Sequence, residues 1–153
     1  MRLEPLRDLL RSCPRGTALD LLPYPALLGL TFERDGDEVR LRLPFAPTLI
    51  GAPERLHGGA IAGLLEFAGM ATLLLALPDD APLPRFKPLT ATVDYLRAGG
   101  MRDTFAVATV TRLGRRVANL NAIAWQYDHS RPIATAKLNI ILASALPPSE
   151  SAP

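Results

Sequence analysis

The chain has 153 residues, the usual size of a single domain, and is long enough to bury a substantial core. Its net charge is only +2, from 17 basic and 15 acidic residues, and aromatic residues make up 6%. With no run of lysine or arginine, this composition argues against a nucleic-acid-binding surface. Cys13 is the only cysteine, which excludes an intrachain disulfide and a cysteine-based metal site. The N-terminal residues contain no apolar run of signal-peptide length, so a cytoplasmic location is expected.

The pattern of prolines and leucines predicts a division into three segments. Residues 1–26 are expected to form a short helix, Glu4–Arg11, followed by an irregular lead-in over 14–25 that carries three prolines. Residues 27–145 are expected to form one α+β domain. Residues 146–153 are rich in proline and serine, which predicts a disordered tail.

Six strands are expected within the domain. The first two, Leu27–Arg34 and Glu38–Phe45, flank an Asp-Gly-Asp hairpin signal at 35–37, and the second alternates apolar and charged side chains. After a proline-rich loop at 78–84, four more strands are expected at Leu89–Arg97, Asp103–Leu113, Arg115–Tyr127 and Pro132–Ala143. Their short connections favour antiparallel pairing. The small apolar residues at even positions 118–124 would let a curved sheet close tightly around a helix.

The segment from Gly58 to Leu77 is apolar on nearly every side except for Glu66. A helix that is hydrophobic all round lies either in a membrane or in a protein core. Glu66 near its middle would cost roughly 2.5–3.5 kcal/mol in a membrane, and the half-buried strands on both sides need a helix to cover them. The sequence therefore predicts an α+β fold in which about six antiparallel strands wrap around one long central helix.

One stripe of this helix carries the candidate chemistry. Gly59 and Gly63 precede Glu66 on the same face, so a substrate or another backbone can approach closely. Near Gly58, the unpaired N–H groups of the helix start would face a developing oxyanion. A helix-packing groove, with Glu66 snorkelling or paired with an arginine, is the alternative. His57 taken alone is more often a cap or a packing residue than a catalyst.

The chain contains three motifs, which are His57-Gly58-Gly59 followed by Glu66, the strand end Val93–Arg97 followed by Ala98-Gly99, and the turn Arg112–Arg115. Together they resemble the hotdog-fold acyl-CoA thioesterases of the phenylacetate-degradation type. The resemblance covers roughly residues 27–143. It implies an antiparallel sheet wrapped around a central helix, and hydrolysis of an acyl-CoA thioester to a free carboxylic acid and CoA.

The resemblance also implies roles for individual residues. Glu66 matches the catalytic carboxylate, which acts either as a general base toward water or as a nucleophile toward the thioester carbonyl. Gly58 matches the glycine whose backbone N–H polarises the thioester oxygen. His57 matches a histidine that supports the loop or the carbonyl end, and Gly59 matches the second glycine of the motif, which permits close approach.

Further residues are expected to bind the substrate. Gly63 keeps the stripe open, while Thr90 and Thr92 are candidates for positioning water, with an ordinary strand surface as the alternative. Because coenzyme A carries phosphates, basic residues are expected near the site entrance. The candidates are Arg97, Arg115 and Arg116, with a solvated turn as the alternative. No metal and no cofactor beyond the CoA of the substrate is expected. In the family a partner strand lines the site, so a homodimer or homotetramer is expected, without nucleic acid or membrane as partner.

Two positions depart from the family pattern. Many relatives carry an asparagine six positions before the histidine, where this chain has Gly51, and a hydroxyl near the carboxylate, where it has Met70. These differences keep a second hypothesis open, namely a protein of the same fold that binds acyl-CoA or another acyl ligand without turnover. A hydratase on this fold is a third hypothesis, which the spacing from His57 to Glu66 fits less well.

Overall fold

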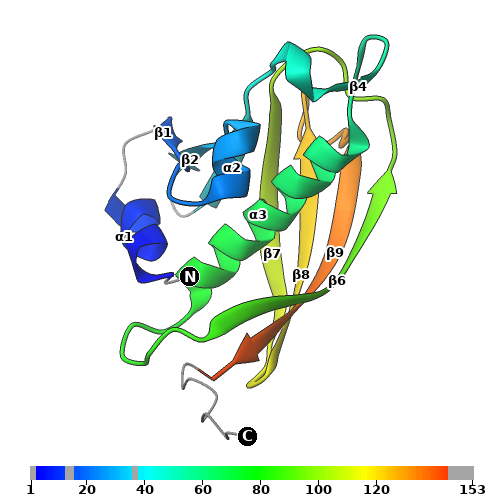
Figure 1. Ribbon diagram of the computed structural model, residues 1–153. Helices are drawn as coiled ribbons and strands as arrows, with labels where there is room; N and C mark the ends of the chain where they lie inside the picture. Colours follow the sequence, from blue (N-terminus) through cyan, green and yellow to red (C-terminus); the bar gives the residue numbers. More distant parts are fainter. Residues whose placement is uncertain (1–2, 13–15, 36–37, 145–153) are drawn as a thin grey trace, which may run out of the picture.

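One long helix lies across a face of an antiparallel sheet in the computed structural model of the chain (Figure 1). The structure describes residues 3–12, 16–35 and 38–144. Cys13, the centre of the expected hairpin turn at 36–37 and the expected tail at 146–153 lie outside these residues. The architecture confirms the predicted α+β fold with a central helix.

The main sheet has seven strands in the order β1-β2-β3-β7-β8-β9-β6, and every neighbouring pair is antiparallel. The strands are β1 (Thr17–Ala18), β2 (Thr31–Asp35), β3 (Glu38–Leu43), β6 (Arg85–Tyr95), β7 (Thr104–Leu113), β8 (Val117–Trp125) and β9 (Ala134–Ala143). Six of them correspond to the six expected strands, and the two-residue β1 is an addition at one edge. A separate hairpin pairs β4 (Ile50–Ala52) with β5 (Arg55–Leu56).

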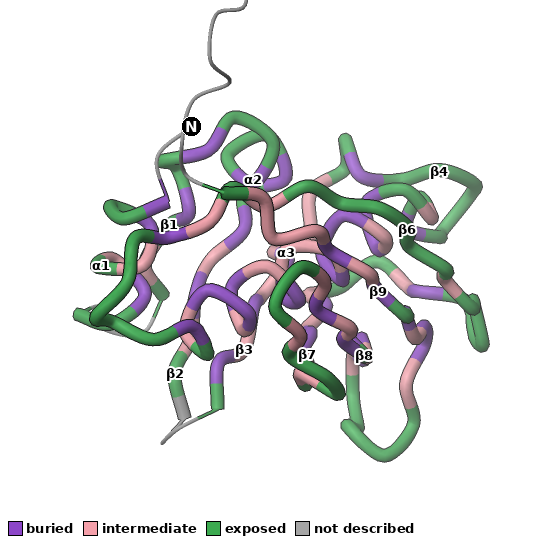
Figure 2. Tube along the Cα trace, turned by 90° about the horizontal axis from the view of Figure 1, so that it is seen from below, coloured by how far each residue is buried: buried purple, intermediate pink, exposed green. Residues whose placement is uncertain are grey.

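The helices are α1 (Glu4–Ser12), α2 (Pro23–Leu28), the central α3 (Gly58–Ala76) and a 3₁₀ turn, η1 (Pro47–Leu49). The boundaries of α3 confirm the helix that the sequence predicts. Figure 2 shows α3 between strands β3, β7 and β8 on one side and α2 on the other.

The region around α2 corrects two expectations. A strand was expected from Leu27, and an irregular segment up to residue 25, but Pro23–Leu28 forms a helix and the strand begins at Thr31. Pro23 occupies the first turn, where proline needs no hydrogen-bonded N–H. Gly29 ends the helix in the left-handed conformation, with φ 65° and ψ 30°. Pro23 and Pro25, from which an irregular segment was predicted, therefore lie in the first turn of a helix.

The inner face of the sheet is built from small residues that let α3 approach closely. Ala118, Ala122 and Ala124 of β8 are at most 2% exposed, as the predicted tight closure requires. A Cβ added to Gly69 would lie 2.3 Å from Leu138 Cδ1, so the helix and β9 are in direct contact there. By length and composition α3 is able to cross a membrane, yet 56% of its apolar stretch is buried inside the protein. Core helices of this kind pass the same test, and the packing against the sheet accounts for the apolar surface.

Candidate functional site

The start of α3 is fixed by His57, which is its N-cap. The Nδ1 atom of His57 accepts a hydrogen bond from the Gly59 N–H at 2.9 Å. The His57 N–H donates to the Leu49 carbonyl at 2.8 Å, and the Leu56 N–H donates to the Gly99 carbonyl at 2.9 Å. Because an accepting Nδ1 carries no proton, the imidazole proton lies on Nε2 in this arrangement. His57 therefore holds the helix start, which agrees with a supporting role.

Gly58 offers a backbone donor at this helix end. Among the described residues no group accepts a hydrogen bond from its N–H, whereas its carbonyl accepts one from the Tyr95 hydroxyl at 2.8 Å. The Tyr95 ring covers one side of Gly58, because an added Cβ would lie 3.2 Å from Tyr95 Cζ. A free N–H at the positive end of a helix suits an oxyanion.

Glu66 lies half-buried in the middle of α3, beside strands β6 and β9. Its carboxylate makes no hydrogen bond or ion pair with any described residue, so the pairing with an arginine, which was one form of the packing alternative, is not observed there. Glu66 and Met70 border a cavity of about 20 Å³, which is room for about one water molecule. The other lining residues come from β6 and β9 and are Pro88, Thr90, Ala91, Leu138, Asn139 and Ile140.

Thr90 and Thr92 of β6 do not point toward α3, as they would have to do to position a water molecule beside Glu66. Tyr95 reaches Gly58 on the helix side, so the alternation of the strand places Thr90 and Thr92 on the outer face. The Thr90 hydroxyl accepts a hydrogen bond from Asn139 Nδ2 at 2.6 Å. Thr92 is exposed opposite Lys137. Thr90 borders the cavity, but within one chain neither hydroxyl is turned toward the helix.

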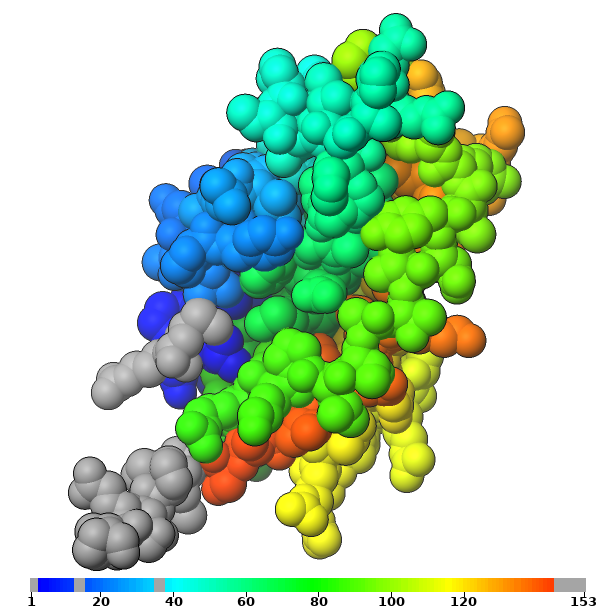
Figure 3. Space-filling view, turned by 45° about the vertical axis from the view of Figure 1, so that its right-hand side comes forward, coloured from blue at the N-terminus to red at the C-terminus, as the bar shows by residue number. Residues whose placement is uncertain are grey.

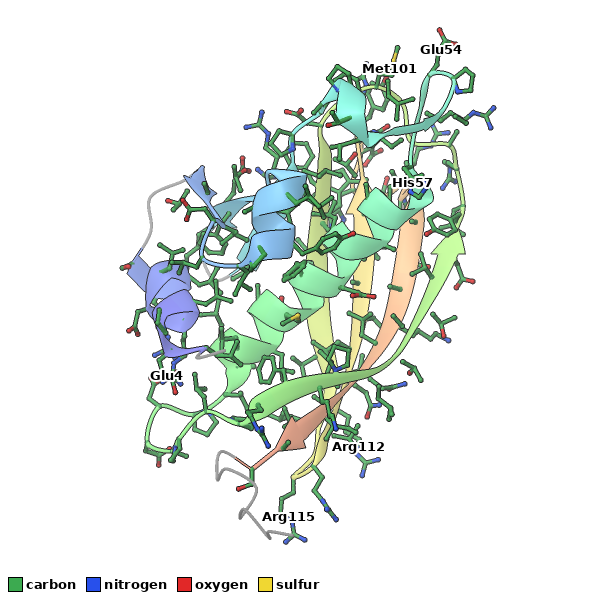
Figure 4. All side chains as sticks on the ribbon, in the orientation of Figure 1. Glu4, Glu54, His57, Met101, Arg112 and Arg115 are labelled. Atoms are coloured by element: carbon green, nitrogen blue, oxygen red, sulfur yellow. The ribbon has the colours of Figure 1, made fainter. Side chains whose placement is uncertain are left out.

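The three arginines expected to bind phosphates do not converge within one chain. Arg97 follows β6, near the start of α3, and its Nη1 donates to the Pro132 carbonyl at 2.6 Å. Arg115 and Arg116 lie at the β7–β8 turn, and Figure 4 places Arg115 at the opposite end of the molecule from His57. These two residues line an open groove of about 1020 Å³ beside Leu77 at the end of α3.

Sequence reasoning missed Tyr24, which α2 places directly over the glycine stripe. A Cβ added to Gly63 would lie 2.9 Å from Tyr24 Cε1 and 3.0 Å from Leu28 Cδ1. The Tyr24 and Phe67 rings are 6.0 Å apart between centroids. Figure 3 shows the exposed surface of α3 as a band between α2 and β6. The Pro-x-Pro pair followed by Gly29 is the signal from which this helix could have been predicted.

Gly51 shows why the chain lacks an asparagine at this position. A Cβ added there would lie 2.7 Å from His57 Cα and 2.8 Å from His57 Cδ2. An asparagine therefore fits only if His57 moves, and His57 is the cap of α3. The glycine and the capping histidine are two parts of one local packing arrangement.

Comparison with known proteins identifies relatives of the chain. Residues 50–140 match the family model described as the acyl-CoA thioesterase N-terminal domain. A search of curated proteins found no match. A solved structure of a Chromobacterium violaceum protein is 31% identical, with a TM-score of 0.72, over 94% of this chain and 99% of that one.

Two further solved structures share the fold at lower identity. A Bacillus halodurans protein crystallised with CoA is 21% identical, with a TM-score of 0.70, over 83% of each chain. A phenylacetic acid degradation-related protein from Ralstonia eutropha JMP134 is 20% identical, with a TM-score of 0.64, over 87% of this chain and 96% of that one. The arrangement of sheet and helix is therefore that of the hotdog thioesterases.

Proposed function

Because the chain belongs to the acyl-CoA thioesterase family, we propose that it hydrolyses an acyl-CoA thioester to a free carboxylic acid and CoA. The observation that carries this proposal is Glu66, a half-buried carboxylate without a partner among the described residues, beside a cavity the size of one water. A buried carboxylate is costly unless it has a partner or a task. The unpaired Gly58 N–H, on the same helix, supplies the second group that thioester hydrolysis needs.

The proposed reaction divides the work between these two groups. The Gly58 N–H donates to the carbonyl oxygen and stabilises the negative charge that develops there. Glu66 removes a proton from a water molecule as the water oxygen attacks the carbonyl carbon. The carbon–sulfur bond then breaks, and the CoA thiolate leaves and takes up a proton. The water-sized cavity supports the general-base route over direct attack by the carboxylate, and neither route uses a metal.

The distance between Gly58 and Glu66 along α3 supports a site that is formed by two chains. Residues 58 and 66 are eight steps apart, which at 1.5 Å per residue is about 12 Å along the helix axis. An oxyanion donor lies about 3 Å from the oxygen, and the attacking atom about 3–3.5 Å from the carbon. Gly58 of one chain and Glu66 of a second chain meet this requirement better than the two residues of one helix.

The second chain has an obvious place to bind, which is β6. This eleven-residue strand forms the open edge of the sheet, where Leu89 is 57% exposed and Tyr95 is 54% exposed. A long exposed edge is a template for pairing with another strand. Antiparallel β6–β6 pairing makes a two-fold homodimer, and two such dimers would make the homotetramer. In this pairing the partner's Arg115 and Arg116 approach the Arg97 end of β6, which would gather the phosphate-binding arginines.

The proposal is tested by free-thiol release from a panel of acyl-CoAs. We expect turnover by the wild-type protein and a loss of at least 100-fold in kcat for Glu66→Gln, which keeps the shape but removes the base. Glu4→Gln, on the exposed side of α1, is the matched control and should retain wild-type activity. Turnover that survives Glu66→Gln would contradict the assigned site while leaving the activity in place.

One observation favours a second function, the binding of acyl-CoA without hydrolysis. The cavity beside Glu66 is lined by Met70, and the Thr90 hydroxyl is engaged with Asn139, so one chain presents no hydroxyl to orient a water. Saturable binding of acyl-CoA without thiol release from any chain length would establish this function and exclude the hydrolase.

A further inference from the structure

We propose that Tyr24 of α2 is the end wall of the acyl-binding groove and sets the length of the acyl group that the enzyme accepts. The inference rests on the proposed thioesterase function and extends it to substrate choice. Tyr24 is not part of the family motif, because α2 lies outside the residues 50–140 that match the family model.

The proposed groove is the surface of α3 that carries Gly59 and Ala62, ahead of Gly63. Gly59 is exposed and Ala62 is half-buried, so this stretch is accessible to a ligand. At Gly63 the opening ends, because Tyr24 lies against the helix backbone and makes Gly63 buried. Any side chain at position 63 would occupy the space of the tyrosine ring, so glycine is what allows the ring to lie there.

The direction of the bound thioester follows from its two ends. Tyr95 touches Gly58, and Arg97 is two residues further along the chain, so the anionic CoA portion leaves the site on that side. The acyl portion, held at the Gly58 N–H, then extends along the stripe toward Gly63. Five residues at 1.5 Å each give about 7.5 Å before it meets Tyr24.

Tyr24 has the properties of an adjustable apolar wall. Its side chain packs against Gly63 and Phe67, and its hydroxyl has no hydrogen-bond partner among the described residues. The residue is 44% exposed, so its truncation removes little of the core. Pro25 and Leu28, which are buried, anchor α2 to the rest of the protein. A Tyr24→Ala variant should therefore fold.

The experiment compares kcat/KM for acetyl-, butanoyl-, hexanoyl- and decanoyl-CoA in wild type, Tyr24→Ala and Tyr24→Phe. We expect wild type to favour the short acyl groups, and Tyr24→Ala to raise the decanoyl-to-acetyl ratio at least tenfold, mainly through KM. Tyr24→Phe keeps the ring and should keep the wild-type ratio. Tyr127→Ala is the matched control, since Tyr127 is 79% exposed and contacts Arg102 instead. An unchanged ratio in Tyr24→Ala, or an equal shift in Tyr127→Ala, overturns the inference.

A binding measurement separates this inference from the proposed function. Non-hydrolysable alkyl-CoA thioethers of the same chain lengths are titrated calorimetrically into wild type and Tyr24→Ala. If wild type hydrolyses no acyl-CoA, the proposed function fails, but a tenfold gain in affinity for the long thioether in Tyr24→Ala still supports the wall. Identical affinity profiles for the two proteins overturn the wall, whether or not hydrolysis is observed.

Discussion

At the scale of single residues, the proposed site depends on backbone N–H groups whose neighbours determine which of them is free to bind a substrate. The Gly58 N–H is available because the Gly59 N–H, not its own, is bound by the His57 imidazole. The sequence favoured a cap or packing role for His57 over catalysis, and the structure shows the cap, in which the imidazole accepts from the Gly59 N–H. The geometry assigns His57 to positioning the helix start.

His57→Ala removes the cap and should lower the free energy of unfolding by about 1 kcal/mol, the usual value for a lost N-cap. It should also lower kcat, because the Gly58 N–H is then less well fixed. His57→Asn restores a capping acceptor and should recover most of the stability and most of kcat. Thermal melts and thiol-release assays on the two variants check this. A stable His57→Asn protein that is as inactive as His57→Ala would show that the imidazole acts on the substrate.

At the scale of elements, one interruption of the regular strand pattern in β6 has a physical reason. Pro88 lies inside β6, which the sheet tolerates because β6 is an edge strand and the register shifts between Pro88 and Thr90. At this shift Leu89 has no partner residue on β9, and its side chain is exposed. A bulge of this kind depends on the partner strand and is not encoded in the local pattern.

The end of β3 is joined to the start of β7 by Asp103. The Phe45 N–H donates to Asp103 Oδ1 at 2.8 Å, and Arg42 Nε donates to Oδ2 at 2.9 Å. The Phe45 hydrogen bond, with the Arg42 hydrogen bond and charge, lowers the pKa of Asp103 below its ordinary value of 3.8, against the opposing effect of burial. These contacts bind the ionised form.

A lowered pKa in the folded state means that the contribution of Asp103 to stability is complete above pH 3.8 and is lost as the pH falls through the folded-state pKa. We therefore expect Asp103→Asn to lower Tm at pH 7, with a difference from wild type that shrinks as the pH falls below 3.8. Calorimetric melts between pH 2.5 and 7 measure this difference. Asp20→Asn, at an exposed turn, is the control. A difference that stays constant over the whole pH range would contradict the assignment.

At the scale of the whole molecule, we propose that two chains complete the site. The edge position of β6 and the spacing of about 12 Å between Gly58 and Glu66 along α3 support this proposal. One chain presents the proposed oxyanion donor at one end of a stripe and the carboxylate at the other. A two-fold axis near the middle of the stripe would place each group opposite its counterpart.

Mixed dimers test this arrangement directly. Glu66→Gln removes the carboxylate, and Gly58→Val obstructs approach to the N–H, so each variant alone should be inactive. In a heterodimer of the two, one site combines the intact Gly58 of one chain with the intact Glu66 of the other. We expect co-expressed, differently tagged and doubly purified heterodimers to recover up to half of the wild-type kcat. Inactive heterodimers would place both groups of each site in a single chain.

Local pattern was enough to predict the long apolar helix from Gly58, six strands, and Glu66 as the one acid of the stripe, because hydrophobic periodicity and motif spacing are local properties. The hydrogen bond between Thr90 and Asn139, the position of Arg115 far from His57, and the packing of Tyr24 on Gly63 depend on the tertiary structure. These are contacts between segments distant in the chain. Strand order, register and helix placement determine these contacts, and a local sequence pattern predicts none of the three.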